Sequence, residues 1–285
     1  RFDMTFPTDV SVPLLKNIRN DAPQAQCTMR ATGVATNLIV NREVPPFDDP
    51  KIRRAMALTL DRQAFIDILS EGQSTMGGAM LAPPDGVWGL PPEMLKSIIG
   101  YGDVGTAREE ARALMSQAGY GPEKRLKIKV STRNIATFRD PAVILIDHLK
   151  QIYIDGELEV IDTSVYYNRV FKKDYAVALN LTGSAVDDPD VTFFEGYACG
   201  SLRNYNNYCN PEMTQLFKAQ SRETDRKKRQ QMVWEIDAKL QEDIARPIIS
   251  NGRAAACWHP HVKGVTIQTN SIYNGWRFED VWLDR

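Results

Sequence analysis

The sequence lacks any run of about eighteen apolar residues, so we expect no membrane-spanning helix. It also lacks the charged segment followed by an apolar one that marks a signal peptide, because it opens on Arg-Phe-Asp. We therefore expect no signal peptide in this chain, and interpret its start as an interior cut or a processed end.

An excess of either charge is missing as well. The 285 residues hold 35 basic and 36 acidic side chains, for a net charge of -1. Such a chain has no long-range field that would concentrate a polyanion, so nucleic acid is not an expected partner. The one basic cluster, residues 226–229, lies among acidic residues and indicates a solvated helix face.

Cysteine and histidine are scarce. The four cysteines, Cys27, Cys199, Cys209 and Cys257, form no CxxC motif, which argues against a zinc ribbon or a thioredoxin-type redox site. An even number permits two disulfides. Cys257, His259 and His261 would share one face of a strand, but Pro260 and the lack of a fourth ligand argue against a metal. We expect neither a metal nor a cofactor.

What the sequence does contain is ordinary globular composition, with 43% hydrophobic and 25% charged residues. The length suffices for one large domain or two ordinary ones. Asp49-Pro50 predicts the start of a helix, Asp61 a second one, and Thr106 with Glu109 a capping box for a helix that ends at Gly119. Residues 72–105 hold much of the Gly and Pro and predict a long ordered loop.

The middle of the chain alternates between strand and helix patterns. Residues 126–130 predict a strand, Asp140-Pro141 opens a helix to about residue 152, and 157–161 predict a strand again, which indicates a parallel βαβ unit. A helix from Ser164, an apolar run at 175–181 and helices from Asn210 and Thr224 follow. The fold class is therefore α/β, with a mixed sheet and surrounding helices.

The pattern changes after Asp243. Three short strands are predicted at residues 247–251, 254–258 and 265–269, and we expect them to belong to another sheet.

Several segments resemble one known family. Residues 41–61, NREVPPFDDPKIRRAMALTLD, are similar to a segment of the peptide- and nickel-binding family (family 5) of extracytoplasmic solute-binding proteins of ABC importers. The resemblance continues through Trp88 after its Pro-Pro loop, residues 117–120, the turn at 187–190, Asn210-Pro211 and the closing residues 262–264 and 281–282.

This resemblance implies a fold of two α/β lobes that enclose a ligand. It assigns residues 41–244 to a second lobe of the type II periplasmic binding protein kind, and residues 1–40 and 245–285 to remnants of a first lobe. The flanking pieces would be strands that need partners from elsewhere, because unpaired strands expose their edges.

The function that the resemblance implies is transport. A small solute, oligopeptide-like or another small organic molecule, would be captured between the lobes by hinge motion and delivered to a membrane permease. The protein would be a monomer in the periplasm and would perform no chemistry on its ligand. The alternative is a carboxylate-dependent hydrolase that uses Asp187 and Asp188.

The resemblance also implies a set of ligand-binding residues. In relatives, a carboxylate after the strand at 175–181 holds the ligand's amino group, and Asp187 or Asp188 fits that role here, although Ser184 occupies the position directly after Thr182-Gly183. For the same carboxylates, a turn and a helix cap stay open as the alternative.

Two arginines and a tyrosine complete this set. Arg133, at the end of a strand, resembles in position an arginine that contacts a ligand carboxylate, and Arg139 competes for that role. Arg203 and Tyr205 would present a donor and a ring to the cleft, or form a solvated loop tip.

Disulfides follow from the same resemblance. Relatives often close a disulfide across the loop that holds Cys199 and Cys209, which would stabilise the fold by roughly 3 kcal/mol and favours an oxidising compartment. Cys27 and Cys257 fall in the two first-lobe remnants, and nothing in the sequence fixes the distance between them.

Overall fold

Five strands form one mixed sheet in the order β3-β2-β4-β1-β5. The computed structural model describes residues 3–6 and 10–284. β2 pairs in parallel with β3 and β4, whereas β1 runs antiparallel to both β4 and β5. The predicted α/β fold with a mixed sheet and a parallel βαβ unit is confirmed. The strands are β1 (Gln26–Val40), β2 (Leu126–Arg133), β3 (Ile154–Ile161), β4 (Val177–Gly183) and β5 (Ile248–Trp258).

Side-chain alternation along the strands gives the sheet two buried faces. Leu38 and Val40 of β1 enter one core, and Ile39 between them enters another. Helices cover the first face and α7 packs on the second. The elements on the first face are α2 (Pro50–Leu58), α3 (Arg62–Ser70), α5 (Val104–Gln117) and α6 (Ala136–Lys150), and α7 is Thr163–Phe171.

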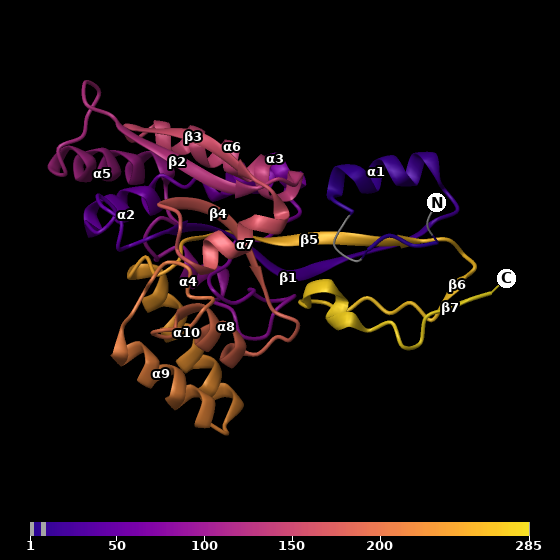
Figure 1. The fold of residues 1–285 in the computed structure, drawn as a ribbon. Coiled ribbons are helices and arrows are strands. Elements are labelled where there is room, and N and C mark those ends of the chain that lie inside the picture. The colour runs from indigo at the N-terminus through magenta and orange to yellow at the C-terminus, as the bar shows by residue number, and fades with distance from the viewer. Residues whose placement is uncertain (1–2, 7–9, 285) are drawn as a thin grey trace.

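A third core lies among helices rather than on the sheet. Phe193, Phe217 and Ile236 are fully or almost fully buried there, and the loop residues Met80 and Trp88 pack against them. These helices form the lower part of the body in Figure 1. They are α8 (Pro189–Tyr197), α9 (Pro211–Arg222) and α10 (Arg226–Glu242), and the short α4 (Pro92–Leu95) lies in the predicted loop.

Several helix starts differ from the predictions. α7 begins at Thr163 rather than Ser164, and Asp225 rather than Thr224 caps α10. Asp103, rather than Thr106, caps α5, since its carboxylate accepts a hydrogen bond from the Thr106 backbone N–H at 2.8 Å. α6 begins at Ala136 and contains Pro141 in its interior, because Phe138 is drawn into the core beside Tyr166.

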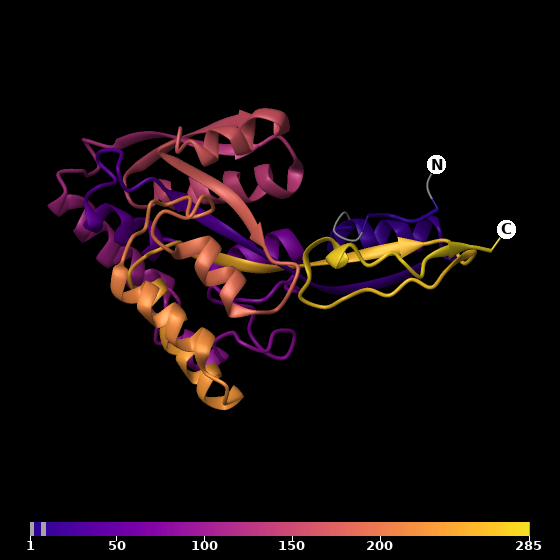
Figure 2. The same cartoon turned by 60° about the horizontal axis from the view of Figure 1, so that its bottom comes forward.

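β1 and β5 continue beyond the sheet as a two-stranded arm (Figures 1 and 2). Residues 34–40 of β1 pair with β4, and residues 35–37 among them also pair with β5, but residues 26–31 pair with β5 alone. Around the arm lie α1 (Val12–Asp21), the 3-10 helix η1 (Ile272–Trp276) and the small sheet of β6 (Val262–Lys263) and β7 (Trp282–Leu283).

The prediction for the C-terminal strands was partly wrong. Residues 248–251 and 254–258 belong to one strand, β5, which joins the main sheet. Residue 247 lies just before this strand, and residues 265–269 form no strand. Gly252 resembles a strand end in the sequence, but pairing with β1 carries the strand through it. The segments flanking the body thus pair with each other.

The predicted division into 1–40, 41–244 and 245–285 stays a prediction. β1 and β5 lie wholly in its outer segments, yet both strands belong to the main sheet. Residues 1–2, 7–9 and 285 of its outer segments, and with them the first residues on which the signal-peptide expectation rests, lie outside the described residues.

Both pairs of cysteines are bonded. Cys27 lies opposite Cys257 in the β1–β5 register, with their Cα atoms 4.2 Å apart. Cys199 and Cys209 close the loop between α8 and α9. One disulfide therefore fastens the arm and the other fixes a loop of the body.

Gly33 marks the point where the arm meets the body. Its φ is +64°, and the β1–β5 register shifts between residues 31 and 35. A Cβ at Gly33 would lie 2.9 Å from the Asn270 carbonyl carbon and 3.0 Å from the Ser184 carbonyl oxygen. The position therefore needs a residue without a side chain for two reasons.

We predict that Gly33→Ala lowers the free energy of unfolding by more than the about 1–2 kcal/mol of left-handed strain alone. Gly200→Ala is the matched control, because Gly200 has φ +76° but a methyl group added there would meet no atom within 4 Å. Urea denaturation of both variants measures the difference. Equal losses would show that the crowding at Gly33 has no energetic effect.

Candidate ligand-binding cavity

A cavity of about 670 Å³ lies where the end of β4, helix α8 and the start of β5 meet. Residues 79–81 of the loop after α3 and residues 270–276 of the C-terminal segment complete its wall. The lining is largely apolar and aromatic, with a few polar groups between the rings. This is the composition typical of a site for a small organic molecule.

Four of the six predicted ligand-binding residues line this cavity: Ser184, Asp187, Arg203 and Tyr205. Arg133 and Asp188 lie outside its lining.

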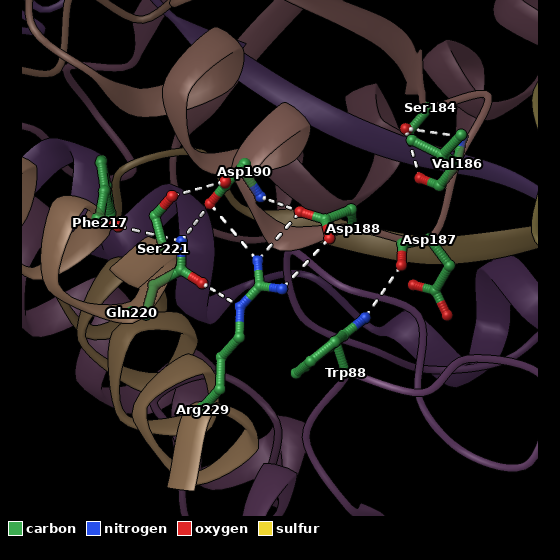
Figure 3. A network of polar contacts seen from close by, with 10 residues as sticks. All are labelled: Trp88, Ser184, Val186, Asp187, Asp188, Asp190, Phe217, Gln220, Ser221 and Arg229. Atoms are coloured by element: carbon green, nitrogen blue, oxygen red, sulfur yellow. Dashed lines mark hydrogen bonds and ion pairs between the residues drawn. The ribbon is translucent and has the colours of Figure 1, made fainter. Parts of the chain in front are cut away.

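Asp187 presents a half-buried carboxylate to the cavity. Its Oδ2 accepts a hydrogen bond from the Val87 backbone N–H at 2.8 Å, and its backbone oxygen accepts one from Trp88 Nε1 (Figure 3). Oδ1 is buried without a hydrogen bond of normal geometry. Burial raises the pKa of this carboxyl, against the lowering influence of Val87 and Asn270. A cationic group of a ligand beside this carboxylate would favour its ionised form.

Asp188 holds helices together instead. Its Oδ1 accepts the Asp190 backbone N–H at 2.9 Å and so caps α8. Arg229 of α10 donates from Nη2 to Oδ1 at 3.1 Å and from Nη1 to Oδ2 at 3.3 Å, and also pairs with Asp190 (Figure 3). The helix cap expected as the alternative role of this turn is present at Asp188.

Ser184 is engaged in its own turn. The hydroxyl donates to the Val186 carbonyl at 2.6 Å and lies 3.2 Å from the Val186 amide, while the Ser184 N–H bonds to Gly33 (Figure 3). A ligand would therefore compete with a local bond for this hydroxyl.

Arg203 and Tyr205 differ in their surroundings. Arg203 is 56% exposed and forms an ion pair of 3.0 Å with Glu195, which also lines the cavity. Tyr205 is buried, so it is no solvated loop tip. The charged groups of Lys173 and Arg246 lie 5.6 and 5.4 Å from the centre of its ring.

Arg133 lies beside the cavity rather than in its wall. Its Nε donates to Thr163 Oγ1 at 3.0 Å, and its guanidinium group is 5.6 Å from the ring of Tyr167, which does line the cavity. Arg139 pairs with its neighbour Asp140 at 3.5 Å.

At the predicted strand face near the C-terminus, the Cys257 sulfur is bonded to Cys27 and so is not available as a thiolate ligand. His259 and His261 stack at 5.6 Å, and His261 Nε2 lies 2.8 Å from Asp3 Oδ1. The described ranges contain no group of three or more potential metal-ligating side chains.

Sequence reasoning missed the cavity residues of β5 and the C-terminal segment. Arg246, Asn251, Asn270, Tyr273 and Trp276 all line the cavity. Because residues 247–251 were predicted to belong to another sheet, no residue of β5 was predicted to line the cavity. The available signal was Arg246 directly before an apolar run, a charge at the mouth of a buried strand.

Comparison with known protein families shows the family to which the chain belongs. The model of the family described as bacterial extracellular solute-binding proteins, family 5 Middle, matches residues 3–203. The chain belongs to this family. Within the described part of the chain, no helix combines the length and the apolarity that crossing a membrane requires.

Individual relatives of the family 5 chain are longer than it is. The oligopeptide-binding protein OppA of Bacillus subtilis is 26% identical over 196 residues, which are 68% of this chain and 35% of OppA. The chain therefore spans about a third of the length of this curated relative.

Solved structures share the fold over nearly the whole chain. OppA of Haemophilus influenzae, in complex with RPPGFSPFR, matches with a TM-score of 0.82 at 21% identity and covers 100% of this chain and 54% of its own. DppA of Helicobacter pylori, in complex with the peptide STSA, matches with a TM-score of 0.81 at 22% identity over 98% of this chain and 52% of its own.

One buried carboxylate outside the cavity holds the backbone of two residues in its wall. Asp237 of α10 is fully buried and accepts hydrogen bonds from the backbone N–H groups of Ala79 and Met80, at 2.8 and 3.2 Å, and from Gln241. Ala79 and Met80 line the cavity. Burial raises the pKa of Asp237 to about 6.

This pKa predicts a pH dependence. Because the folded-state pKa of Asp237 lies above the ordinary aspartate value of 3.8, the stability gained by protonation is fully present below about pH 4 and is lost as the pH rises through about 6. We expect Asp237→Asn to remove up to about 3 kcal/mol of this change in unfolding free energy between pH 4 and 7. Denaturation at several pH values tests it, and parallel curves for both proteins would contradict the prediction.

Proposed function

We propose that this chain is part of the substrate-binding component of an ABC importer, which captures a small solute between two lobes and delivers it to a membrane permease. The observation that supports this proposal is the cavity of about 670 Å³ in a family 5 fold. Its volume and its lining of rings with few polar groups suit one small organic molecule.

The ligand we propose is oligopeptide-like or another small organic solute. The relatives with bound peptides favour a peptide, and the carboxylate of Asp187 offers an acceptor for an amino group. Ser184, at the position directly after Thr182-Gly183, has no carboxylate to hold an amino group, so non-peptide solutes are tested alongside peptides. For Arg133 we propose an indirect contribution through its contact with Tyr167.

We further propose that no chemistry is performed on the ligand. A hydrolase built on Asp187 and Asp188 would need both carboxylates at the reacting bond. Asp188 is already used to cap α8 and to pair with Arg229, and it does not line the cavity. This geometry disfavours the hydrolase.

The compartment and partners are proposals of the same kind. Two disulfides suit an oxidising compartment such as the periplasm. We propose that the protein works there as a monomer with its permease as the partner.

A thermal-shift screen of the full-length protein tests the proposal. Short peptides are compared with an equal set of non-peptide organic solutes. A ligand at 100 times its Kd stabilises the folded state by about 2.7 kcal/mol, which raises Tm measurably. Recovery of the stabilising compound unchanged after incubation supports binding without chemistry. Turnover of the compound would contradict the transport function.

Variants of two neighbouring residues then distinguish a ligand contact from a residue that only stabilises the fold. We expect Asp187→Ala to weaken binding of the stabilising ligand about tenfold or more with little change in Tm, because it removes a charged acceptor in the cavity. Asp188→Ala should instead cost about 1–2 kcal/mol of stability through the lost cap, with affinity nearly unchanged. Calorimetric titration and thermal denaturation measure both effects. The reverse pattern would exclude Asp187 as the ligand contact.

A further inference from the structure

Arg246 is a buried cation in the wall of the cavity. It lies just before β5, separated from it by Pro247, is only 4% exposed and belongs to the cavity lining. Its guanidinium lies 4.9 Å from the ring centre of Tyr197 and 5.4 Å from that of Tyr205. The two rings and the backbone of Gly196 surround it.

The hydrogen bonds of Arg246 use one of its three nitrogens. Nη2 donates to the carbonyl oxygens of Gly196 at 2.6 Å and Arg203 at 2.8 Å. Nε is buried without a hydrogen bond, and no described residue accepts one from Nη1. A structural role in fixing the loop therefore accounts for only two of the five N–H donors.

Several other arginines pair with a carboxylate. Arg229 pairs with Asp188, Arg253 with Asp85 and Arg203 with Glu195. Arg62 is also buried without an ion pair, but it does not line the cavity, and Nε and Nη1 both donate to backbone carbonyls. Within residues 3–6 and 10–284, Arg246 forms no ion pair with a carboxylate.

A second cation reinforces the positive charge. Lys173 lies 5.6 Å from the ring centre of Tyr205, and its Nζ donates to the carbonyl oxygen of Asn204. Burial, and then the charge of Arg246, lowers the pKa of Lys173 to about 8. Leaving a buried guanidinium without a counter-charge is costly, so the site favours a ligand that brings one.

We propose that Arg246 binds a carboxylate of the ligand at the end of the cavity bounded by Tyr197 and Tyr205. This inference rests on the proposed function and adds a charged group to the ligand's chemistry. The carboxylate can come from the end of a peptide or from a non-peptide organic acid. Its oxygens would accept hydrogen bonds from Nη1, the guanidinium nitrogen that has no hydrogen bond and is not fully buried.

Matched acids and amides test the proposal in the full-length protein. The probes are a set of di- to pentapeptides as free acids, the same set as C-terminal amides, and 3-phenylpropionate with 3-phenylpropionamide. We expect an acid to bind about 10- to 100-fold more tightly than its amide, because the amide removes the counter-charge. The peptide and non-peptide arms identify the source of the carboxylate.

Variants attribute the preference to one side chain. Arg246→Gln should abolish the preference for acids, and Arg246→Lys should retain part of it. Arg253→Gln is the matched control, because this arginine of β5 pairs with Asp85 and does not line the cavity, and it should keep the preference.

The outcomes separate the two proposals. If no probe and no other small solute binds, the proposed function fails. If probes bind but acids and amides bind equally, or if the preference survives in Arg246→Gln, only the role of Arg246 fails. If Arg246→Gln does not fold, the comparison of acids with amides in the unmutated protein still tests whether the site prefers a carboxylate.

Discussion

The antiparallel pairing of β1 with β5 is the constraint on which the rest of the structure depends. It joins residues more than two hundred positions apart, as the Cys27–Cys257 disulfide at a separation of 230 shows. β1 brings β4 to its other edge, and β5 places Arg246 and Asn251 in the cavity wall. Without these two strands, the sheet would keep only three strands, the cavity would lose the wall residues that depend on β1 and β5, and the arm would not exist.

Local signals were sufficient for most of the body. Asp49-Pro50, Asp61 and Asn210-Pro211 each begin the helix they predicted, because a capping side chain and a proline act over a few residues. The alternating run at residues 126–130 and the apolar run at 175–181 correspond to β2 and β4 for the same reason. Pro141 misled the prediction for α6, since the burial of Phe138 extends that helix upstream.

The cavity could be predicted only in part. The turn after β4 carried Ser184 and Asp187, so its sequence position was enough to find them. No local pattern separates Asp187 from Asp188, because the difference arises from Arg229, which approaches Asp188 from a helix about forty residues away. Arg246 and the aromatic residues 273 and 276 reach the cavity through β5 and the arm, and that arrangement depends on long-range pairing.

The order in which the cavity wall is contributed has a consequence for synthesis. Its lining extends from Gly33 to Trp276, so the wall draws on residues from near the beginning of the chain to near its end. Contacts between such distant residues form late, because a long loop must close before they are made. A chain that stops before β5 could fold most of its helices, yet it would have no enclosed site. The cavity wall is therefore complete only when β5 and the following residues through Trp276 have been added.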